Sequence, residues 1–345
     1  MCKGEKYYPL FIFLLLILFV TKSCYPVSQI IGGNTKNPKD FTAPQSEENL
    51  SIGFWNAENL FDLEDDPSKN DNEFAIGGRK NVNQEIYDLK IRHCSEVLLD
   101  LDVDILGLCE VENFQVLNDL NMAYKNRDYS IIHYDSPDNR GIDNALMYDS
   151  DHFSVLSSRA IPNKLKNESS TRDILHVVGE YKKETLHIFV NHWPSNYGGK
   201  EKAIPKRTFT AQLIMREIES LVKIDKFAEI ILIGDFNEDP DDKNIMLLED
   251  SKLSSLMTPM LGKPKVGTYV YRGKDYFYDQ IIVNDQLLDD MKLSIVKESI
   301  YILDLPKYRQ QEGNYKHYPF RFWAGNKLLG GYSDHLAIRV EIIKV

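Results

Sequence analysis

Acid, amide and imidazole side chains stand directly beside apolar runs in two short strings of the chain. One string carries Asp235 and Asn237 straight after an aliphatic run, and the other, about a hundred residues later, carries Asp334 and His335 ahead of an apolar stretch. Polar groups at strand ends are held rigidly by a sheet and still meet solvent. The two strings therefore predict a catalytic floor at the edge of a β-sheet.

Carboxylates and amides also occur in two earlier extended segments. Asn56 and Glu58 are expected to share one face of a strand, which presents an amide and a carboxylate side by side. Glu110 ends the apolar run 103–109, where a carboxylate is costly to bury without a cation. Hard cations such as Mg²⁺ or Mn²⁺ prefer such oxygens. Taken alone, the first pair also fits a solvated strand face, and Glu110 also fits a helix N-terminus.

Groups that can move protons complete the set. His192 follows an apolar run and precedes a turn, which places it at a surface cleft, although a single histidine is more often structural. Asp235, oriented by Asn237 on the same face, can accept a proton from water, as in a hydrolase. Asp279 begins a late strand and His335 precedes the final one. A histidine with an aspartate that orients its ring handles protons or contacts phosphate.

Apolar periodicity predicts the elements that must position these side chains. Strands are expected at 50–56, 103–109, 144–148, 174–181, 185–191, 229–233, 268–271, 278–283 and 336–343, and helices over 86–101 and 201–224. Many strands with a few long helices between them favour an α/β fold in which two sheets pack together with helices outside. The polar residues 63–84 are predicted to be an insertion.

The composition suits one large domain. The chain has 345 residues, is 43% hydrophobic and carries a net charge of −11, which becomes −13 when residues 1–23 leave with three Lys and one Glu. Such a surface does not attract polyanions non-specifically, which argues against tight sequence-independent duplex binding and leaves a local basic groove open.

The N-terminus predicts export. Residues 1–23 have the form of a signal peptide, because two lysines precede an apolar run at 10–20 that is too short to span a bilayer comfortably. A retained anchor is the alternative. Cys24 stands where bacterial lipoproteins carry a lipidated cysteine, although Lys22 departs from the usual small residue. Residues 24–48 predict a flexible tether. We expect a cell-envelope protein attached to a membrane through a lipid on Cys24, or otherwise a secreted one.

Three further features are the cysteines, the acids of the insertion and an aromatic stretch. The first two are expected to be structural, and the third has two interpretations. Cys94 and Cys109 are predicted to be buried free thiols, and zinc-site spacing is absent from the sequence. Four acids in the insertion lack EF-hand spacing and predict a solvated acidic loop in place of a Ca²⁺ site; they are Asp65, Asp66, Asp71 and Glu73. The stretch 308–323 interleaves aromatic and basic residues, which fits base stacking or a cover over the sheet.

In this order the strings resemble the endonuclease/exonuclease/phosphatase superfamily, the deoxyribonuclease-I-like metal-dependent phosphoesterases. The resemblance covers residues 49–345 and rests on Gly-Asp-Phe-Asn at 234–237 together with Ser-Asp-His at 333–335. Asn-Ala-Glu-Asn at 56–59 and Glu-Val-Glu-Asn at 110–113 look like bacterial secreted members. The resemblance implies a four-layer sandwich of two packed mixed β-sheets flanked by helices.

The resemblance also implies a metal site and the groups around it. It implies that Glu110 binds a divalent metal, with Glu58 and Asp334 close enough to help directly or through water. Asn56 would orient neighbouring catalytic groups. The expected ion is Mg²⁺, with Mn²⁺ or Ca²⁺ as alternatives.

The remaining implied roles concern water and phosphate. Asp235 would activate or position the attacking water, and Asn237 would hold the phosphate or Asp235. Asp279 would orient His335, which contacts the scissile phosphate or takes the proton from water. His192 is a candidate acid for the leaving oxygen. The implied lining of the phosphate pocket is Arg140 and Asn144.

These residues predict a monomeric, metal-dependent phosphodiesterase, an endonuclease-like nuclease acting on nucleic acid. A phospholipid substrate, as in sphingomyelinase-like enzymes, or a sugar phosphate is the alternative. A binding protein on an inactive scaffold is disfavoured because none of the expected site residues is lost; those present are Glu110, Asp235, Asn237, Asp334 and His335.

Overall fold

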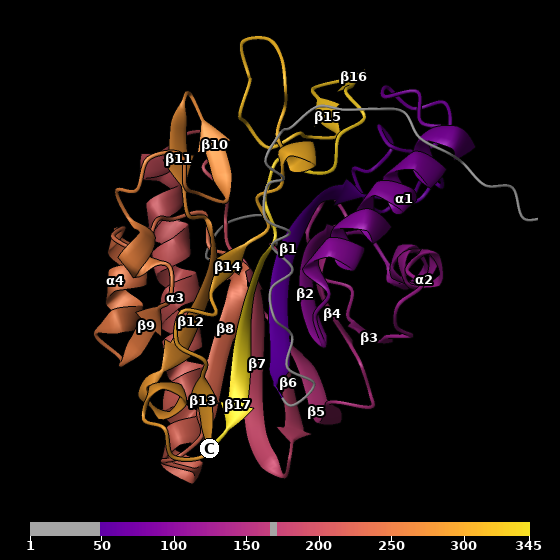
Figure 1. Ribbon diagram of the computed structural model, residues 1–345. Coiled ribbons are helices and arrows are strands. Elements are labelled where there is room, and N and C mark those ends of the chain that lie inside the picture. The colour runs from indigo at the N-terminus through magenta and orange to yellow at the C-terminus, as the bar shows by residue number, and fades with distance from the viewer. Residues whose placement is uncertain (1–48, 166–170) are drawn as a thin grey trace, which may run out of the picture. The chain divides into compact units, whose positions relative to one another are not determined.

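Two β-sheets packed face to face, with helices outside each sheet, make up the part of the chain that the computed structural model describes (Figure 1). This part comprises residues 49–165 and 171–345. The predicted signal peptide, Cys24 and the tether lie outside the described residues.

The first sheet joins the two ends of the domain. Its strands are β1 (Leu50–Leu60), β2 (Ile105–Val111), β3 (Ser130–His133), β4 (Asp143–Tyr148), β13 (Leu293–Ile295), β14 (Tyr301–Ile302) and β17 (Ile338–Lys344). They lie in the order β13-β17-β1-β2-β4-β3, and β14 also pairs with β17. The sheet is mixed, because β1 is parallel to β2 and antiparallel to β17.

The second sheet has six strands. They are β5 (Ser154–Ile161), β6 (Ile174–Tyr181), β7 (Glu184–His192), β8 (Glu229–Asp235), β9 (Leu253–Ser255) and β12 (Asp279–Asn284), in the order β5-β6-β7-β8-β12-β9. Two short hairpins lie toward one end of the sandwich (Figure 1), namely β10 (Tyr269–Tyr271) with β11 (Lys274–Tyr276), and β15 (Trp323–Ala324) with β16 (Lys327–Leu328).

Each sheet has its own pair of helices. α1 (Gln84–Leu101) and α2 (Phe114–Ala123) cover the first sheet, and α3 (Lys200–Ile224) and α4 (Lys243–Glu249) cover the second. The side chains of Asn83 and Asn113 accept hydrogen bonds from backbone amides in the first turns of α1 and α2, which fixes where these helices begin. Three 3₁₀ turns follow at Thr258–Met260, Asp285–Leu288 and Pro306–Tyr308. Within the described ranges, no helix has the length and apolar character needed to cross a membrane.

Alternation along β1 separates two cores. Ile52 and Phe54 pack between the sheets, whereas Trp55 and Ala57 pack toward α1. The sheets approach closely at Gly107, where a Cβ atom would lie 2.6 Å from Cδ1 of Ile233. By the same period of two, Asn56 points toward the second sheet. The strand therefore delivers its amide to the interface where the acids of β8 and β12 end.

The predicted two-sheet α/β architecture is confirmed. The structure adds elements that the apolar pattern did not predict, including α2 and β5. β5 is an edge strand with mostly exposed side chains, so it carries little apolar signal. The prediction of buried free thiols at Cys94 and Cys109 is confirmed.

Candidate active site

Three neighbouring strands place a histidine and two aspartates in one row. His192 of β7 pairs in register with Asp235 of β8, and Asp235 pairs with Asp279 of β12. Gly234 allows β7 and β8 to meet here, because a Cβ atom on it would lie 2.5 Å from the backbone oxygen of Asn191. The row lies at the end of the second sheet where both parallel strands terminate.

The Asp235 carboxylate is the point where the site residues meet. Its Oδ2 accepts a 3.1 Å hydrogen bond from Nδ2 of Asn56, and it lies 3.7 Å from Nε2 of His192 and 3.9 Å from Nε2 of His335. Its Oδ1 accepts a 2.9 Å bond from the backbone amide of Asn237. Side chains from both sheets therefore orient one buried oxygen toward the same space.

The loop before β17 is fastened to β1, which fixes the position of His335. Ser333 Oγ donates to the backbone oxygen of Asn56 at 2.7 Å and accepts from the His335 amide at 3.0 Å. The indole Nε1 of Trp55 donates to the His335 backbone oxygen at 3.2 Å. His335 Nδ1 donates to Oδ2 of Asp279 at 2.7 Å. The ring is therefore held from three sides with Nε2 directed at Asp235.

Burial and neighbouring charges shift the proton affinities in opposite directions. Burial raises the pKa of Asp235 to about 7; the Asp279 charge adds to the rise and His335 opposes it. Burial alone would lower the pKa of His335, but the carboxylates of Asp279 and Asp235 raise it well above its ordinary value. At neutral pH the site thus combines an imidazolium with a carboxylate poised to gain or lose a proton.

His192 has the opposite character. Burial, with the nearby positive charges of Arg172 and Arg140, lowers the pKa of His192 well below its ordinary value. Its Nε2 lies 3.8 Å from Oε1 of Glu110. We predicted His192 as an acid for the leaving oxygen, and the lowered pKa of its ring disfavours the charged form that this role uses. A neutral ring is a weak acid at pH 7, so this position suits hydrogen bonding better than proton donation.

Glu110 projects from a bulge at the end of β2. Its φ of 58° is left-handed, and the register with β4 shifts between Cys109 and Val111. The bulge turns the carboxylate into the cleft, where Oε2 accepts a 3.0 Å bond from the Asn59 amide. Within the described residues its one basic neighbour inside 4.0 Å is His192.

Glu58 does not share the face of Asn56 as predicted. The left-handed backbone at Glu58 and Asn59, with φ of 50° and 54°, breaks the alternation of β1. The two Glu58 carboxylate oxygens accept bonds from the amides of Phe322 and Trp323, at 2.6 and 3.1 Å. Burial raises the pKa of Glu58 to about 8, and the charge of Asp334 adds to the rise. In the structure the partners of this carboxylate are therefore the backbone amides of Phe322 and Trp323.

The other predicted residues lie around the same cleft. Asp334 accepts a 2.5 Å bond from Arg321. Asn237, with φ of 53°, turns its side chain to the backbone oxygen of Trp193 at 3.2 Å, so it holds Asp235 through its backbone and not from a shared strand face. Asn144 is buried on β4 and donates to the backbone oxygen of Asp173. Arg140 is exposed and lines the cleft, whereas Asn144 does not.

These groups open into a cleft of about 1200 Å³. Its lining includes several residues that sequence reasoning missed, namely Arg172, Asn196, Lys200, Lys202, Lys206, Lys274 and the four tyrosines Tyr269, Tyr271, Tyr276 and Tyr278. Arg172 is buried and donates to Asp138 at 3.2 Å and to the Trp193 backbone oxygen at 2.7 Å. No local pattern marks it in the sequence. The tyrosines do show a pattern, because they alternate on either side of a Gly-containing turn.

Tyrosines of the β10–β11 hairpin form one wall beside His335. The rings of Tyr269 and Tyr278 stack at 5.2 Å between centroids, and Tyr269 lies 4.7 Å from the His335 ring. By contrast, the aromatic stretch 308–323 mostly covers the fold. Tyr308, Phe322 and Trp323 are buried, and Arg321 alone of that stretch lines the cleft.

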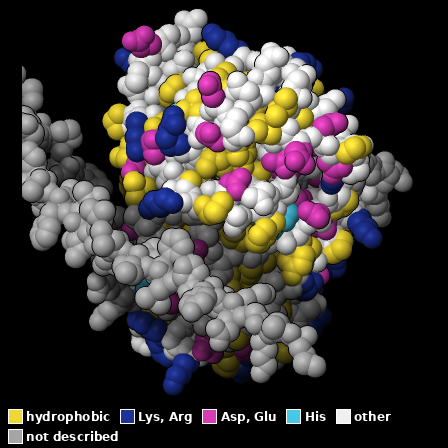
Figure 2. Space-filling view, turned by 90° about the vertical axis from the view of Figure 1, so that its right-hand side faces the viewer, with side chains coloured by type: hydrophobic (Ala, Val, Ile, Leu, Met, Phe, Trp, Pro, Cys, Tyr) yellow, Lys and Arg dark blue, Asp and Glu magenta, His cyan; other side chains and the backbone are white. Residues whose placement is uncertain are grey.

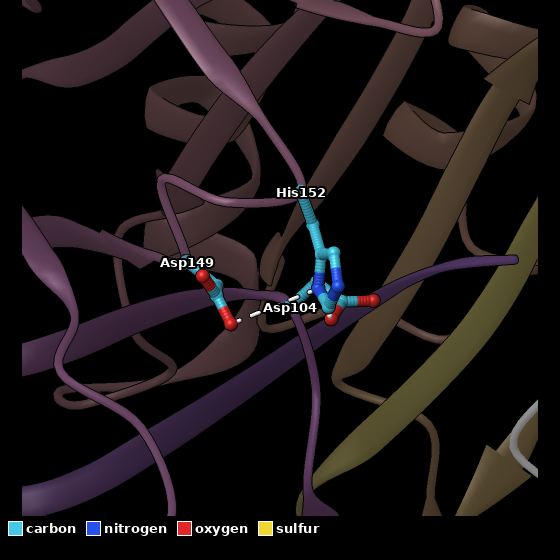
Figure 3. A group of neighbouring side chains, drawn as sticks. All are labelled: Asp104, Asp149 and His152. Carbon is cyan, nitrogen blue, oxygen red and sulfur yellow. Dashed lines mark hydrogen bonds and ion pairs between the residues drawn. The ribbon is translucent and has the colours of Figure 1, made fainter. Parts of the chain in front are cut away.

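Another acid–histidine group lies at the opposite end of β2. Asp104, Asp149 and His152 approach each other there (Figure 3). The Arg127 guanidinium already pairs with Asp104 at 2.7 Å and with Asp149 at 3.1 Å, and Ser51 donates twice to the second Asp104 oxygen. These carboxylates have protein partners, so the group is a structural ion-pair network.

The cleft has the donor set of a hard divalent cation. Asp235, Asp279 and His335 offer ligand atoms within 4.8 Å of one another, and the Glu110 carboxylate faces the same cleft. Carboxylate oxygens that lack a Lys or Arg partner are the ligands that Mg²⁺, Mn²⁺ and Ca²⁺ prefer. Glu110 and Asp235 meet this condition within the described residues, so the residues present fit a divalent metal.

Comparisons with known proteins agree with this geometry. The endonuclease/exonuclease/phosphatase family profile matches residues 51–344, and a search of curated proteins found no match. The structure is similar to D. rerio TDP2 complexed with single-strand DNA product, at 14% identity and TM-score 0.56, covering 85% of this chain and 98% of that one. It is similar to the human nocturnin catalytic domain with bound sulfate, at 16% identity and TM-score 0.53, covering 86% of this chain and 95% of that one. It is also similar to a Bacteroides thetaiotaomicron protein of the matched family, at 17% identity and TM-score 0.51, covering 85% of this chain and 97% of that one.

Proposed function

Because the chain belongs to the endonuclease/exonuclease/phosphatase family, we propose that it is a divalent-metal-dependent phosphodiesterase that acts on nucleic acid. Members of this family generally hydrolyse phosphate esters with metal ions. The observation that carries the proposal is the meeting of Asn56, His192 and His335 at one oxygen of Asp235. That arrangement orients a carboxylate whose pKa is near neutrality, as a base that acts on water requires.

Each residue has a distinct part in the proposed reaction. Asp235 takes the proton from the attacking water, and the Asn56 amide keeps its Oδ2 directed at the cleft. His335, charged because of Asp279, faces the phosphate and stabilises negative charge on its oxygens. Glu110 would hold the divalent metal, which when bound supplies Lewis-acid polarisation of the phosphoryl group. His192, whose pKa burial lowers, would stay neutral beside Asp235 and Glu110.

The charges of the cleft support an anionic substrate. Among the described residues its lining has seven Lys or Arg and five Asp or Glu, a surplus of two positive charges in a chain whose net charge is −11. On the face that carries α1 and α2, acidic side chains are scattered among apolar and basic ones (Figure 2). Electrostatic attraction of a polyanion is therefore expected at the cleft and not over the surface at large.

The tyrosine wall favours a substrate with bases over a lipid or a sugar phosphate. Tyr271 is 49% exposed and lines the cleft beside Tyr269 and Tyr278, so a base can stack on its ring. Stacking contributes about 1–3 kcal/mol per base. The similarity to TDP2 with a single-strand DNA product agrees with this substrate class.

A panel of substrates tests the proposal. The purified protein is assayed with Mg²⁺ on single- and double-stranded DNA, RNA, sphingomyelin vesicles and a phosphomonoester, with Asp235→Asn as the inactive control. We expect cleavage of a nucleic acid. Tyr271→Ala should raise KM, whereas Tyr315→Ala, which removes an exposed ring outside the cleft, should not. Hydrolysis of sphingomyelin or the monoester alone would refute the nucleic-acid assignment.

We also propose export and lipid attachment at Cys24. The proposal is supported by the apolar run at 10–20 and the cysteine that follows it. More than one acyl chain is needed for stable membrane residence. Cys24→Ser should move the protein from the membrane to the soluble fraction without altering the activity of the purified domain. An unmodified Cys24 in the intact mass of the mature protein would exclude attachment.

A further inference from the structure

The insertion between β1 and α1 contains a carboxylate that is neither solvated nor paired. Asp71 is 1% exposed, although the acids of this loop were predicted to be solvated. Its Oδ2 accepts a 2.9 Å bond from the Asp66 amide, while its Oδ1 is buried and has no hydrogen-bond partner. A buried charged oxygen without a partner is unfavourable, and such groups normally pair or coordinate a metal.

A second carboxylate lies beside Asp71. The Glu112 side chain lies within hydrogen-bonding reach of Asp71, and its Oε2 accepts a 2.7 Å bond from the Asp62 amide. The Asp62 side chain lies at the edge of the pair, where its oxygens accept from Glu64 and Asn113. Within the described residues, no Lys, Arg or His nitrogen comes within 4.0 Å of these three carboxylates.

We propose that Asp71 and Glu112, with Asp62 at the edge, form a second cation site that takes Ca²⁺ and is separate from the site at Glu110. Two opposed carboxylates on an irregular loop offer the oxygen-rich, flexible coordination that Ca²⁺ accepts and Mg²⁺ does not favour. The opposed pair lacks a positive partner, and a bound cation would supply one.

The location gives the site a consequence for the cleft. Asp71 belongs to the insertion, and the Asn70 amide donates to the backbone oxygen of Asn139 at 2.6 Å, next to Arg140. Glu112 follows Glu110 by two residues at the end of β2. A cation held between Asp71 and Glu112 would therefore fasten the insertion to the end of β2, which carries Glu110.

Thermal unfolding with and without Ca²⁺ tests the site. The full chain is unfolded in EDTA and in increasing CaCl₂, as wild type, Asp71→Asn, Glu112→Gln, Glu110→Gln and Glu64→Gln. Glu64 is an exposed acid of the same loop, so its variant controls for charge alone. We expect Ca²⁺ to raise Tm by about 5 °C at about 100 times Kd in wild type, Glu64→Gln and Glu110→Gln. The rise should vanish in Asp71→Asn and Glu112→Gln.

The metal-free measurements separate a cation site from a shared proton. In EDTA, Asp71→Asn should be at least as stable as wild type, because its amide can donate to Glu112. In Ca²⁺ wild type should be more stable than Asp71→Asn, and trypsin should cut wild type after Lys69 and Arg79 more slowly than it does in EDTA. A Ca²⁺ response that survives Asp71→Asn but is lost in Glu110→Gln would overturn the proposal. So would the absence of any response together with a destabilised Asp71→Asn in EDTA, which indicates a shared proton.

Discussion

The fully buried Asp279 carboxylate lies 2.7 Å from Nδ1 of His335, and this contact leaves Nε2 facing Asp235 at 3.9 Å. The negative charge of Asp279 thus keeps the His335 ring positively charged where it faces Asp235. Asp279 is inaccessible to a substrate, so its effect on the reaction passes through the protonation and orientation of His335.

Asp279→Asn should shift the activity to lower pH. The substitution retains the shape but removes the charge that raises the pKa of His335, so the imidazolium is lost at a lower pH than in wild type. We expect the alkaline limb of kcat/KM to move toward acid, with a loss of roughly 10²-fold at pH 8. The stabilising effect of the pair should likewise be present below about pH 6.5 and disappear as pH rises through the folded-state pKa. Asp241→Asn removes an exposed charge and should leave both profiles unchanged.

Asp235→Asn should lower turnover by at least about 10²-fold while the fold survives. In wild type, kcat/KM should rise with pH through about 7, because burial raises the pKa of Asp235 to that value. That limb should be missing from any residual activity of the variant. Because the pKa of Asp235 is higher in the folded state than in the unfolded state, ionisation of this carboxyl group lowers the stability of wild type as pH rises from about 4 to the folded-state pKa. Urea unfolding at pH 8 should therefore find the variant at least as stable, and near wild-type activity in a folded variant would remove Asp235 from the mechanism.

A comparison of Glu110→Gln with Glu58→Gln should distinguish a metal ligand from a residue with a structural role. Glu110 faces the cleft, so its variant should need much more Mg²⁺ for half-maximal activity while its stability changes little. Glu58 accepts two backbone amides, so Glu58→Gln loses an acceptor and should be destabilised by about 1–3 kcal/mol. Its Mg²⁺ requirement should stay close to that of wild type. A strong Mg²⁺ effect in Glu58→Gln would return this residue to the metal site.

Arg127→Ala should destabilise the protein by about 3–5 kcal/mol, because it removes the guanidinium that pairs with the buried Asp104 and with Asp149. Burial favours a raised pKa for Asp104, but hydrogen bonds from Ser51 and the charge of Arg127 lower it below its ordinary value. This stabilisation is present above about pH 4 and is lost as pH falls through the lowered pKa. Urea midpoints of wild type and variant should converge in strong acid. Arg159→Ala, which breaks an exposed pair with Glu217, should cost under about 1 kcal/mol.

The sequence allowed prediction of the two-sheet fold and placed His192, Asp235 and Asp279 each at an end of an apolar strand, but it did not predict that these strands are neighbours. Each of these residues stands at the end of an apolar strand, and strand ends meet at a common edge. Glu58 and Asn237 were placed on the wrong faces because both have left-handed backbone, which interrupts the period of two. Such a reversal depends on tertiary contacts that the local pattern does not contain.

Long-range packing explains what the sequence did not reveal. Arg172 enters the cleft only because Asp138 and Trp193, distant in the chain, accept its hydrogen bonds. Asp71 was expected in solvent, yet the insertion folds back and buries it. The aromatic stretch 308–323 left two interpretations open, and the structure supports the cover, since contacts with α1 and with Glu58 bury three of its rings.

The tryptophans lie beside the active site, so the intrinsic fluorescence of the protein can report on it. The chain has three tryptophans, and each touches a different part of the site. Trp55 bonds the His335 backbone, Trp193 accepts from Arg172 and Asn237, and the Trp323 amide is held by Glu58. Because indole fluorescence responds to local polarity and nearby charge, unlabelled protein should report ligand entry through changes in emission wavelength and intensity. A fluorimeter can then follow binding in variants that no longer turn over.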